Sequence, residues 1–511
     1  MKTWIYPIFI CLVFISLLVN HHLQNERKLP TDQWSRTITL KEATSKSVPF
    51  TYQKGNEYHI FQAGEQMVNH LITNDRLETS KVEEIPVRIP DPLAFWAYGS
   101  QLMFLKDGEI IHFDGEHEKV LANNVKGMSS SEKQVIYWND KSIYSIDTES
   151  FRSERIAESE QTIEDVILNI QSDSFIVLSD RASTDIKVHY FTKQGKDYTP
   201  VKVTEISEAG VARLTEMDFL EIDGKLHITY STFGTAKQQL NYRSYYTSIN
   251  QKSLGQPLNF EELLFHNEGN GERLFKPRDL HLFLNDGKPS ILFTTKGRTV
   301  GKQMADNIYM SSKSGEKWMA RRISTGNHSS EQPQNIGDGT VIWLDYSGEE
   351  YMVSGASNNP EAVKQSMKLN SEDWKNALSN SMSGLFAGFI ILLIAFIWVA
   401  PPAIYLFIIN LVKEESIDQK KQWVLWSTII VYIAVQFMLV PKIFNRSFFA
   451  NAPEYLTFSG TMFVIPLGLA LLAYGLMKIG TEHNWGIFSK VFYFACLNIL
   501  FFIILIGPYT I

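Results

Sequence analysis

The sequence contains little cysteine: only Cys11 and Cys496 occur among its 511 residues, and both lie inside apolar runs. The long polar middle of the chain therefore has no cysteine and forms no internal disulfide bond. Large exported domains of eukaryotes usually carry disulfides, because the secretory pathway is oxidising. If the polar middle is exported, its lack of cysteine favours a bacterial source.

The sequence also lacks the short motifs of several common enzyme classes. It contains no G-x-x-x-x-G-K-[ST], G-x-G-x-x-G, H-E-x-x-H or C-x-x-C pattern. These patterns mark phosphate-binding loops, dinucleotide-binding folds, zinc peptidases and thiol oxidoreductases. We therefore expect a protein without catalytic activity, cofactor or metal.

An excess of basic residues is missing as well. Residues 20–380 hold 40 Lys and Arg against 50 Asp and Glu, and the whole chain has a formal charge of −7. An acidic surface repels phosphate backbones. The charge balance argues against a nucleic acid partner.

Apolar residues concentrate at the two ends of the chain. Uncharged runs of this length are typical of transmembrane helices, so we predict five spans and the lipid bilayer as a partner. The second run has 29 residues, or about 43 Å of helix, and we expect one tilted helix kinked at Pro401 and Pro402. The predicted spans are residues 4–19, 384–412, 423–440, 455–477 and 491–506.

The first run follows Lys2 and has the form of a signal sequence. Because Asn20-His21-His22 follows it instead of a small-residue cleavage site, we favour an uncleaved signal anchor over a cleaved signal peptide. None of the five predicted spans contains Asp, Glu, Lys, Arg or His. Ion-coupled transporters usually carry such groups within the membrane, so this absence argues against transport.

Lysine and arginine in the short loops predict the orientation of the spans. Placing Lys2 and the loops 413–422 and 478–490 inside gives six positive residues inside, against two in the loop 441–454. Residues 20–380 and the C-terminal end then lie outside the cytoplasm. We expect a multi-pass protein of a bacterial plasma membrane.

The polar middle has the pattern of short β-strands. Apolar or alternating stretches of four to eight residues recur between turn residues, as at 101–105, 135–138, 226–230 and 341–344. The turns lie on average about 47 residues apart, a period typical of propeller blades. We predict a six- or seven-bladed β-propeller, with an array of β-sandwiches as the alternative. The predicted turns are at Gly55, Gly99, Ser131, Asp173, Gly224, Gly287 and Gly339.

One stretch of this region resembles a known family. Ser311, Gly315 and Trp318 match the S-x-D-x-G-x-x-W turn, or Asp-box, of sialidase-like β-propellers, although Lys313 replaces the aspartate. In that family the motif is structural, because it fixes a hairpin and packs its aromatic residue between strands. The resemblance therefore implies a fold and no activity.

Two arginines are candidates for ligand binding. Arg88, in Val87-Arg88-Ile89-Pro90, resembles the element of sialidases whose arginine binds the substrate carboxylate, and Arg278 offers a second guanidinium. No tyrosine and glutamate pair for the nucleophile is legible in the sequence. A further cluster from His112 to Glu118 has the residue types of metal ligands, but Asp114-Gly115 is also a standard hairpin turn.

The sequence thus predicts four parts: residues 1–22 as the anchor helix, 30–358 as an all-β extracytoplasmic domain, 359–383 as a helical linker and 384–511 as an all-α bundle of four transmembrane helices. Asn359 and Pro360 form a good start for the linker helix. We expect a membrane-anchored sensor or scaffold that binds a ligand or another membrane or exported protein. The alternatives are a cell-surface hydrolase of sialidase type and an accessory subunit of a transporter or envelope-assembly complex.

Overall fold

The structure is a computed structural model that describes residues 2–43, 45–90, 94–168, 173–179, 185–194, 197–207, 213–236, 239–256, 258–298, 304–337, 339–481 and 485–510. The chain forms two compact units. One comprises residues 28–368, and the other combines residues 1–27 with residues 369–511. Each unit is described by itself.

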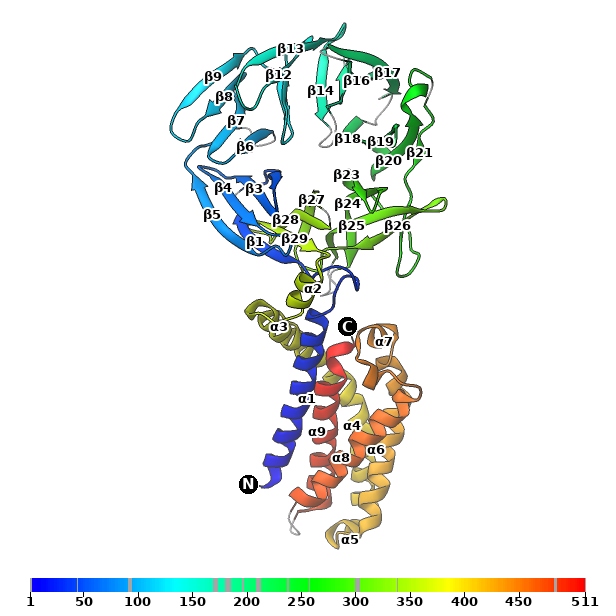
Figure 1. Cartoon of the computed structure of the whole chain (residues 1–511). Coiled ribbons are helices and arrows are strands. Elements are labelled where there is room, and N and C mark those ends of the chain that lie inside the picture. The colour runs from blue at the N-terminus through cyan, green and yellow to red at the C-terminus, as the bar shows by residue number, and fades with distance from the viewer. Residues whose placement is uncertain are drawn as a thin grey trace. The chain divides into compact units, whose positions relative to one another are not determined.

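Seven β-sheets of four or five strands form a ring in the unit of residues 28–368 (Figure 1). Apart from β22 in the sixth sheet and β1 in the seventh, strands that follow each other along the chain are antiparallel neighbours, so each sheet is one blade of a seven-bladed propeller. This finding confirms the predicted propeller and excludes the sandwich array. The first four blades are β2 (Phe50–Lys54), β3 (Glu57–Ala63), β4 (Val68–Thr73) and β5 (Thr79–Ile85); β6 (Phe95–Tyr98), β7 (Gln101–Lys106), β8 (Glu109–Phe113) and β9 (Glu118–Asn123); β10 (Gly127–Ser130), β11 (Val135–Trp138), β12 (Ser142–Ile146) and β13 (Ser153–Glu158); and β14 (Ile163–Leu168), β15 (Phe175–Ser179), β16 (Asp185–Gln194) and β17 (Asp197–Ser207).

The last three blades are longer or use strands from distant parts of the chain. In the sixth blade, β22 adds a fifth strand, parallel to β26. In the seventh, β1 near the N-terminus pairs antiparallel with β29 and closes the ring. The fifth blade is β18 (Arg213–Ile222), β19 (Lys225–Ala236), β20 (Gln239–Asn250) and β21 (Glu261–Glu262), with η1 (Gln251–Ser253) between β20 and β21. The sixth is β22 (Phe265–Asn267), β23 (Arg278–Asn285), β24 (Lys288–Arg298), β25 (Met304–Ser314) and β26 (Lys317–Arg322). The seventh is β27 (Ser329–Gly337), β28 (Thr340–Tyr346), β29 (Tyr351–Ser357) and β1 (Ile38–Ala43).

Six of the seven turns predicted from the sequence lie between the first and second strands of a blade, and the turn at Gly287 lies between β23 and β24 of the sixth blade. The glycines at five of them have a left-handed backbone; Gly224, for example, has φ +70° and Gly287 has φ +72°. Residues with a Cβ atom rarely adopt this conformation. The glycine at each of these hairpins therefore allows the chain to reverse within two residues, and the spacing of the glycines records the spacing of the blades.

The Asp-box resemblance falls on the hairpin between β25 and β26. Gly315 has φ +62°, Trp318 is 3% exposed, and the Ser311 hydroxyl donates to the Met319 carbonyl at 3.0 Å. Lys313 pairs with Glu261 at 2.6 Å, and its ammonium lies 5.9 Å from the centre of the Trp318 ring. Lysine at the aspartate position thus holds the hairpin by an ion pair and a cation–π contact.

The second unit is helical. Among its described residues, five segments are long and apolar enough to cross a membrane, namely Trp4–Glu26, Ser371–Val412, Gln422–Ile443, Thr461–Gly480 and Ile487–Tyr509. Its helices are α1 (Lys2–Glu26), α3 (Ser371–Gly388), α4 (Ile390–Val412), α5 (Glu414–Asp418), α6 (Gln422–Ile443), α7 (Arg446–Asn451), η2 (Glu454–Leu456), α8 (Thr461–Gly480), α9 (Ile487–Leu505) and η3 (Gly507–Tyr509).

Within this helical unit, α1 begins at the same end as α5, and the C-terminal end of the chain lies at the other end with α7 (Figure 1). Many large apolar side chains on its outer surface are exposed, including Leu393 at 70%, Phe396 at 74% and Met438 at 78%. Its buried residues form a single apolar cluster between the helices. An apolar exterior of this extent is consistent with a membrane-spanning unit.

The structure corrects three predicted helix limits. The run 384–412 is interrupted at Phe389, whereas Pro401 and Pro402 lie inside α4. At this interruption Gly388 packs so closely that a Cβ atom would lie 2.8 Å from the Ile503 carbonyl oxygen. The backbone approach between α3 and the end of α9 therefore coincides with the break, and the prolines do not.

The predicted linker helix is also divided. Asn359 caps α2 (Pro360–Ser366) as expected, but α2 ends at Ser366 and α3 starts anew at Ser371. Asn370 accounts for the restart, because its side chain accepts from the Asp373 amide at 2.8 Å and Asp373 bonds back to the Asn370 amide. The third correction is the start of α8 at Thr461 instead of residue 455, since Gly460 precedes it with φ +87°.

Candidate functional site

Two adjoining cavities lie among the first strands of the blades. The first has a volume of about 830 Å³ and is lined mainly by β2, β23 and β27. The second has about 640 Å³ and is lined mainly by β10, β14, β18 and β23. Ser130, His281, Phe283 and Asn335 line both. We call the two cavities together the central channel.

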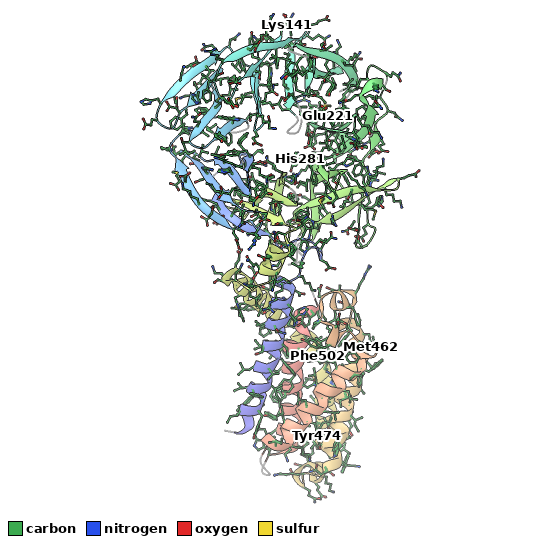
Figure 2. The ribbon with its side chains drawn as sticks, in the orientation of Figure 1. Lys141, Glu221, His281, Met462, Tyr474 and Phe502 are labelled. Carbon is green, nitrogen blue, oxygen red and sulfur yellow. The ribbon has the colours of Figure 1, made fainter. Side chains whose placement is uncertain are left out.

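His281 lies at the middle of the channel, on β23 (Figure 2). Its Nδ1 atom is 3.1 Å from a carboxylate oxygen of Asp218 on β18, and the same oxygen accepts the Leu282 amide at 2.8 Å. Because β23 is the edge strand of its sheet, part of its backbone has no neighbouring strand to bond. Asp218 thus accepts a backbone N–H at the edge of the next blade and orients the imidazole of His281.

Glu216, which also lies on β18, accepts a second hydrogen bond from the backbone of the edge strand β23. Its Oε2 atom accepts the Leu280 amide at 3.2 Å, while its Oε1 atom is buried with no hydrogen-bond partner among the described residues. Burial, and secondly the charge of Asp279, raises the pKa of Glu216 to about 7. This carboxyl group is therefore held close to its titration point at neutral pH.

The charge of the channel has one sign. The described residues that line the two cavities include Glu132, Asp165, Asp218 and Asp286, with His281 as the sole histidine and no lysine or arginine. The sequence did not reveal this set, since its members lie on four blades and converge only when the ring closes. Their one local signal is the proximity of Glu132 and Asp286 to the predicted turns at Ser131 and Gly287.

The two arginines predicted as ligand-binding residues lie on different parts of the ring. Arg278 starts β23, and its guanidinium bonds Asp306 at 2.7 Å. Arg88 is exposed in the segment between β5 and β6, where it lines a third cavity of about 570 Å³ with Lys106, Phe113 and other residues. Neither arginine is among the described residues that line the central channel.

A tyrosine and glutamate pair, which the sequence did not reveal, joins the fourth and fifth blades. The Tyr190 hydroxyl on β16 donates to Glu221 on β18 at 2.8 Å and also bonds Ser174 and Gln251 (Figure 2 labels Glu221). Tyr190 is 1% exposed, and burial raises its pKa to about 12. A nucleophile needs a reachable and easily ionised group, so this environment opposes such a role.

The candidate metal cluster of residues 112–118 is a hairpin. One Asp114 oxygen accepts the amides of Glu116 and His117 at 2.9 and 2.8 Å, which is the turn that Asp114-Gly115 predicted. His112 is buried against Phe151, with ring centres 3.9 Å apart. Across the part of the chain that the structure describes, no three His, Cys, Asp or Glu side chains are grouped so that they could hold a metal ion.

No protein-family model and no curated protein matches the sequence. Among solved structures, the N-terminal domain of Nup159 is 10% identical, with a TM-score of 0.37 over 64% of this chain and 96% of that one. The sialidase of Trypanosoma rangeli in complex with sialic acid is 9% identical, with a TM-score of 0.35 over 65% and 58% of the two chains. The endo-arabinase of Bacteroides thetaiotaomicron is 14% identical, with a TM-score of 0.29 over 55% and 99%. This chain therefore has only a weak resemblance to sialidases and other β-propellers.

Proposed function

We propose that this protein is a membrane-anchored binding protein that takes up a ligand in the central channel of its propeller and does not catalyse a reaction. The observation that carries the proposal is the channel itself. Its adjoining cavities of about 830 and 640 Å³ are concave, and their polar side chains come from several blades. Concave sites with a few converging polar groups are the usual places where proteins bind small molecules.

The properties of the helical unit support the proposal that the protein is anchored in a membrane. Its five apolar segments and the exposed apolar side chains on their outer surface fit a hydrocarbon environment. The lysines of the loop 413–422 lie near α5, at the end of the unit where α1 begins, and Lys442 and Arg446 lie near α7. This segregation supports a propeller outside the cytoplasm. The absence of cysteine from the propeller favours a bacterial source, and we propose that the helices form a docking platform for another membrane protein.

A glycoside hydrolase of sialidase type is the second candidate, and the bond between Tyr190 and Glu221 is the observation that favours it. Three features weigh against it. Tyr190 is buried, Arg278 is already bonded to Asp306, and the described channel lining offers no lysine or arginine for a sugar carboxylate. The balance of these features favours binding without catalysis.

The test uses the purified full chain in a neutral detergent. A panel of fluorogenic glycosides, sialosides included, should give no turnover above that of a heat-denatured sample. Turnover that disappears in Tyr190→Phe and in Arg278→Ala, while both variants stay folded, would establish the hydrolase instead.

Binding in the channel is tested separately by calorimetry with Thr51→Trp. Thr51 lies on β2 and lines the first cavity, and it is only partly buried. Tryptophan suits a strand, and its larger side chain should project into the first cavity and obstruct it without disturbing the fold. The variant should keep its thermal midpoint and lose the binding of any channel ligand. Ser129→Trp, which places a bulky side chain in the second cavity, provides an independent obstructed variant.

A further inference from the structure

We infer that the ligand of the central channel is a small linear organic cation with ammonium groups at both ends, such as an aliphatic diamine or polyamine. The inference rests on the proposed function, because it assigns a chemical class to the ligand of the same channel. The charge of the lining, its distribution along the channel and its effect on neighbouring groups support it.

The carboxylates occur at two levels. Glu132 and Asp286 line only the first cavity, whereas Asp165 and Asp218 line only the second, and His281 lies between the two pairs. A single ammonium group reaches one level at a time. A chain with a cationic group at each end can reach both levels, with its methylene stem beside Phe283, which lines both cavities.

The negative field is felt by groups beside the channel. Burial raises the pKa of Tyr52, a lining residue on β2, and Glu132 adds to this rise. The contribution of Glu132 shows that the carboxylates of the lining disfavour a further negative charge at this wall, and a field of this sign favours a cation in a cleft.

Glu132 and Asp286 are free to serve a ligand. Both are exposed to the first cavity, and no hydrogen bond or ion pair of either side chain is formed with the described residues. Asp286 has φ +50°, a conformation that asparagine also adopts readily. Glu132→Gln and Asp286→Asn therefore remove charge while preserving shape and fold.

The experiment compares three eight-carbon probes of equal length: 1,8-diaminooctane, 1,8-octanediol and octanedioate. Each is titrated calorimetrically into the full chain in neutral detergent, at low and high salt. We expect the diamine to bind about tenfold or more tightly than the diol, the diacid to bind weakest, and the advantage of the diamine to shrink with salt. The double variant Glu132→Gln/Asp286→Asn should lose about tenfold in diamine affinity.

Two controls separate the possible failures. Glu149→Gln removes an exposed carboxylate from the turn between β12 and β13 and should leave diamine binding unchanged. Thr51→Trp should abolish it. If the diol or the diacid binds as well as the diamine, and Thr51→Trp abolishes that binding, the proposal of a cationic ligand is wrong and the channel remains a binding site. If no probe binds in a manner that Thr51→Trp abolishes, both the cation and the channel site are refuted.

Discussion

The propeller and the helical unit place their apolar side chains in opposite ways. In the propeller, apolar residues form six clusters within and between blades, and its large exposed apolar side chains are scattered. In the helical unit, one cluster fills the space between helices, while Leu393, Phe396, Met438 and many others point outward. The outward-facing apolar side chains of the helical unit are consistent with a membrane environment, whereas the propeller has the distribution of a protein domain in water.

Polar groups show the complementary difference. Acidic and basic side chains cover the outside of the propeller and pair across its strands, as Lys106 does with Glu118 at 2.8 Å. In the helical unit the polar side chains of Tyr432, Gln436 and Asn498 are fully buried and bond each other. In water a polar group is satisfied at the surface, whereas in hydrocarbon it must find its partner inside.

Impermeant thiol reagents provide the sharpest test of this comparison, because their outcome is all or none. Single cysteines are introduced into a Cys11→Ala/Cys496→Ala chain at Lys141 on the propeller (Figure 2), at Asp418 in α5 and at Glu454 in η2, all of which are exposed. On intact cells Lys141→Cys and Glu454→Cys should be labelled. Asp418→Cys should react only after lysis.

Ser416, in the same short helix as Asp418, is unsuitable because it is 7% exposed and would resist labelling on either side. If only Asp418→Cys were labelled on intact cells, the predicted orientation of the spans would be wrong and the opposite orientation would hold.

Two phenylalanines give the next largest effect. Phe104 in β7 is fully buried, so Phe104→Ala should leave a cavity and reduce the free energy of unfolding of the propeller by about 3–5 kcal/mol. Phe396 in α4 is 74% exposed, so Phe396→Ala should change stability by less than about 0.5 kcal/mol. Denaturant titrations of the full chain, followed by circular dichroism, measure both. Equal losses would show that Phe396 packs against protein.

Much of the propeller could be predicted because its signal is local. A glycine with positive φ marks the first hairpin of five blades, and the hairpins at Ser131 and Asp173 follow the same rhythm. Blade number could not be fixed, since the seventh blade borrows β1 from the far end of the chain. The helix limits at Phe389 and Ser371 depended on close backbone packing and on a capping residue, which hydropathy does not report.

The candidate site was less predictable. Arg88 was chosen by a short resemblance and Arg278 as a possible second guanidinium, and their role in ligand binding stays a prediction. The acidic residues of the channel were missed because each sits in a different blade, as Asp165 and Asp286 illustrate. The spacing of residues along the sequence does not indicate which side chains of seven separate strands will face a common axis.

A pH-dependent effect should distinguish the propeller from the helical unit. The pKa of Glu216 is raised from its ordinary value of 4.5 to about 7, so the folded state binds more protons than the unfolded state between these values. The group's stabilising contribution is present below 4.5 and is lost as the pH rises through 7. Glu216→Gln removes the cost of ionisation and should stabilise the propeller above this pKa by on the order of 1–3 kcal/mol.

Below pH 4.5 the variant and the parent protein should unfold alike, because both then carry a neutral side chain at this position. Thermal midpoints across this range measure the difference, with Glu149→Gln as the control in an exposed turn. A constant offset at every pH would contradict the assignment.

The smallest effect is expected from the buried polar cluster of the helical unit. The Tyr432 hydroxyl in α6 and the Gln436 amide both donate to Oδ1 of Asn498 in α9, each at 2.9 Å. Tyr432→Phe removes one of these two donors and leaves the other, so Asn498 keeps a partner. Hydrogen bonds between transmembrane helices average about 0.6 kcal/mol, and the loss should be of this order. Unfolding by sodium dodecyl sulfate in mixed micelles measures it, with Tyr474→Phe in α8 as the same chemical change where the ring packs on Trp426. A loss several times larger for Tyr432→Phe than for Tyr474→Phe would mean that the cluster fixes the arrangement of α6 and α9. The two units would then differ in how strongly their stability depends on hydrogen bonds, as well as in where their polar side chains lie.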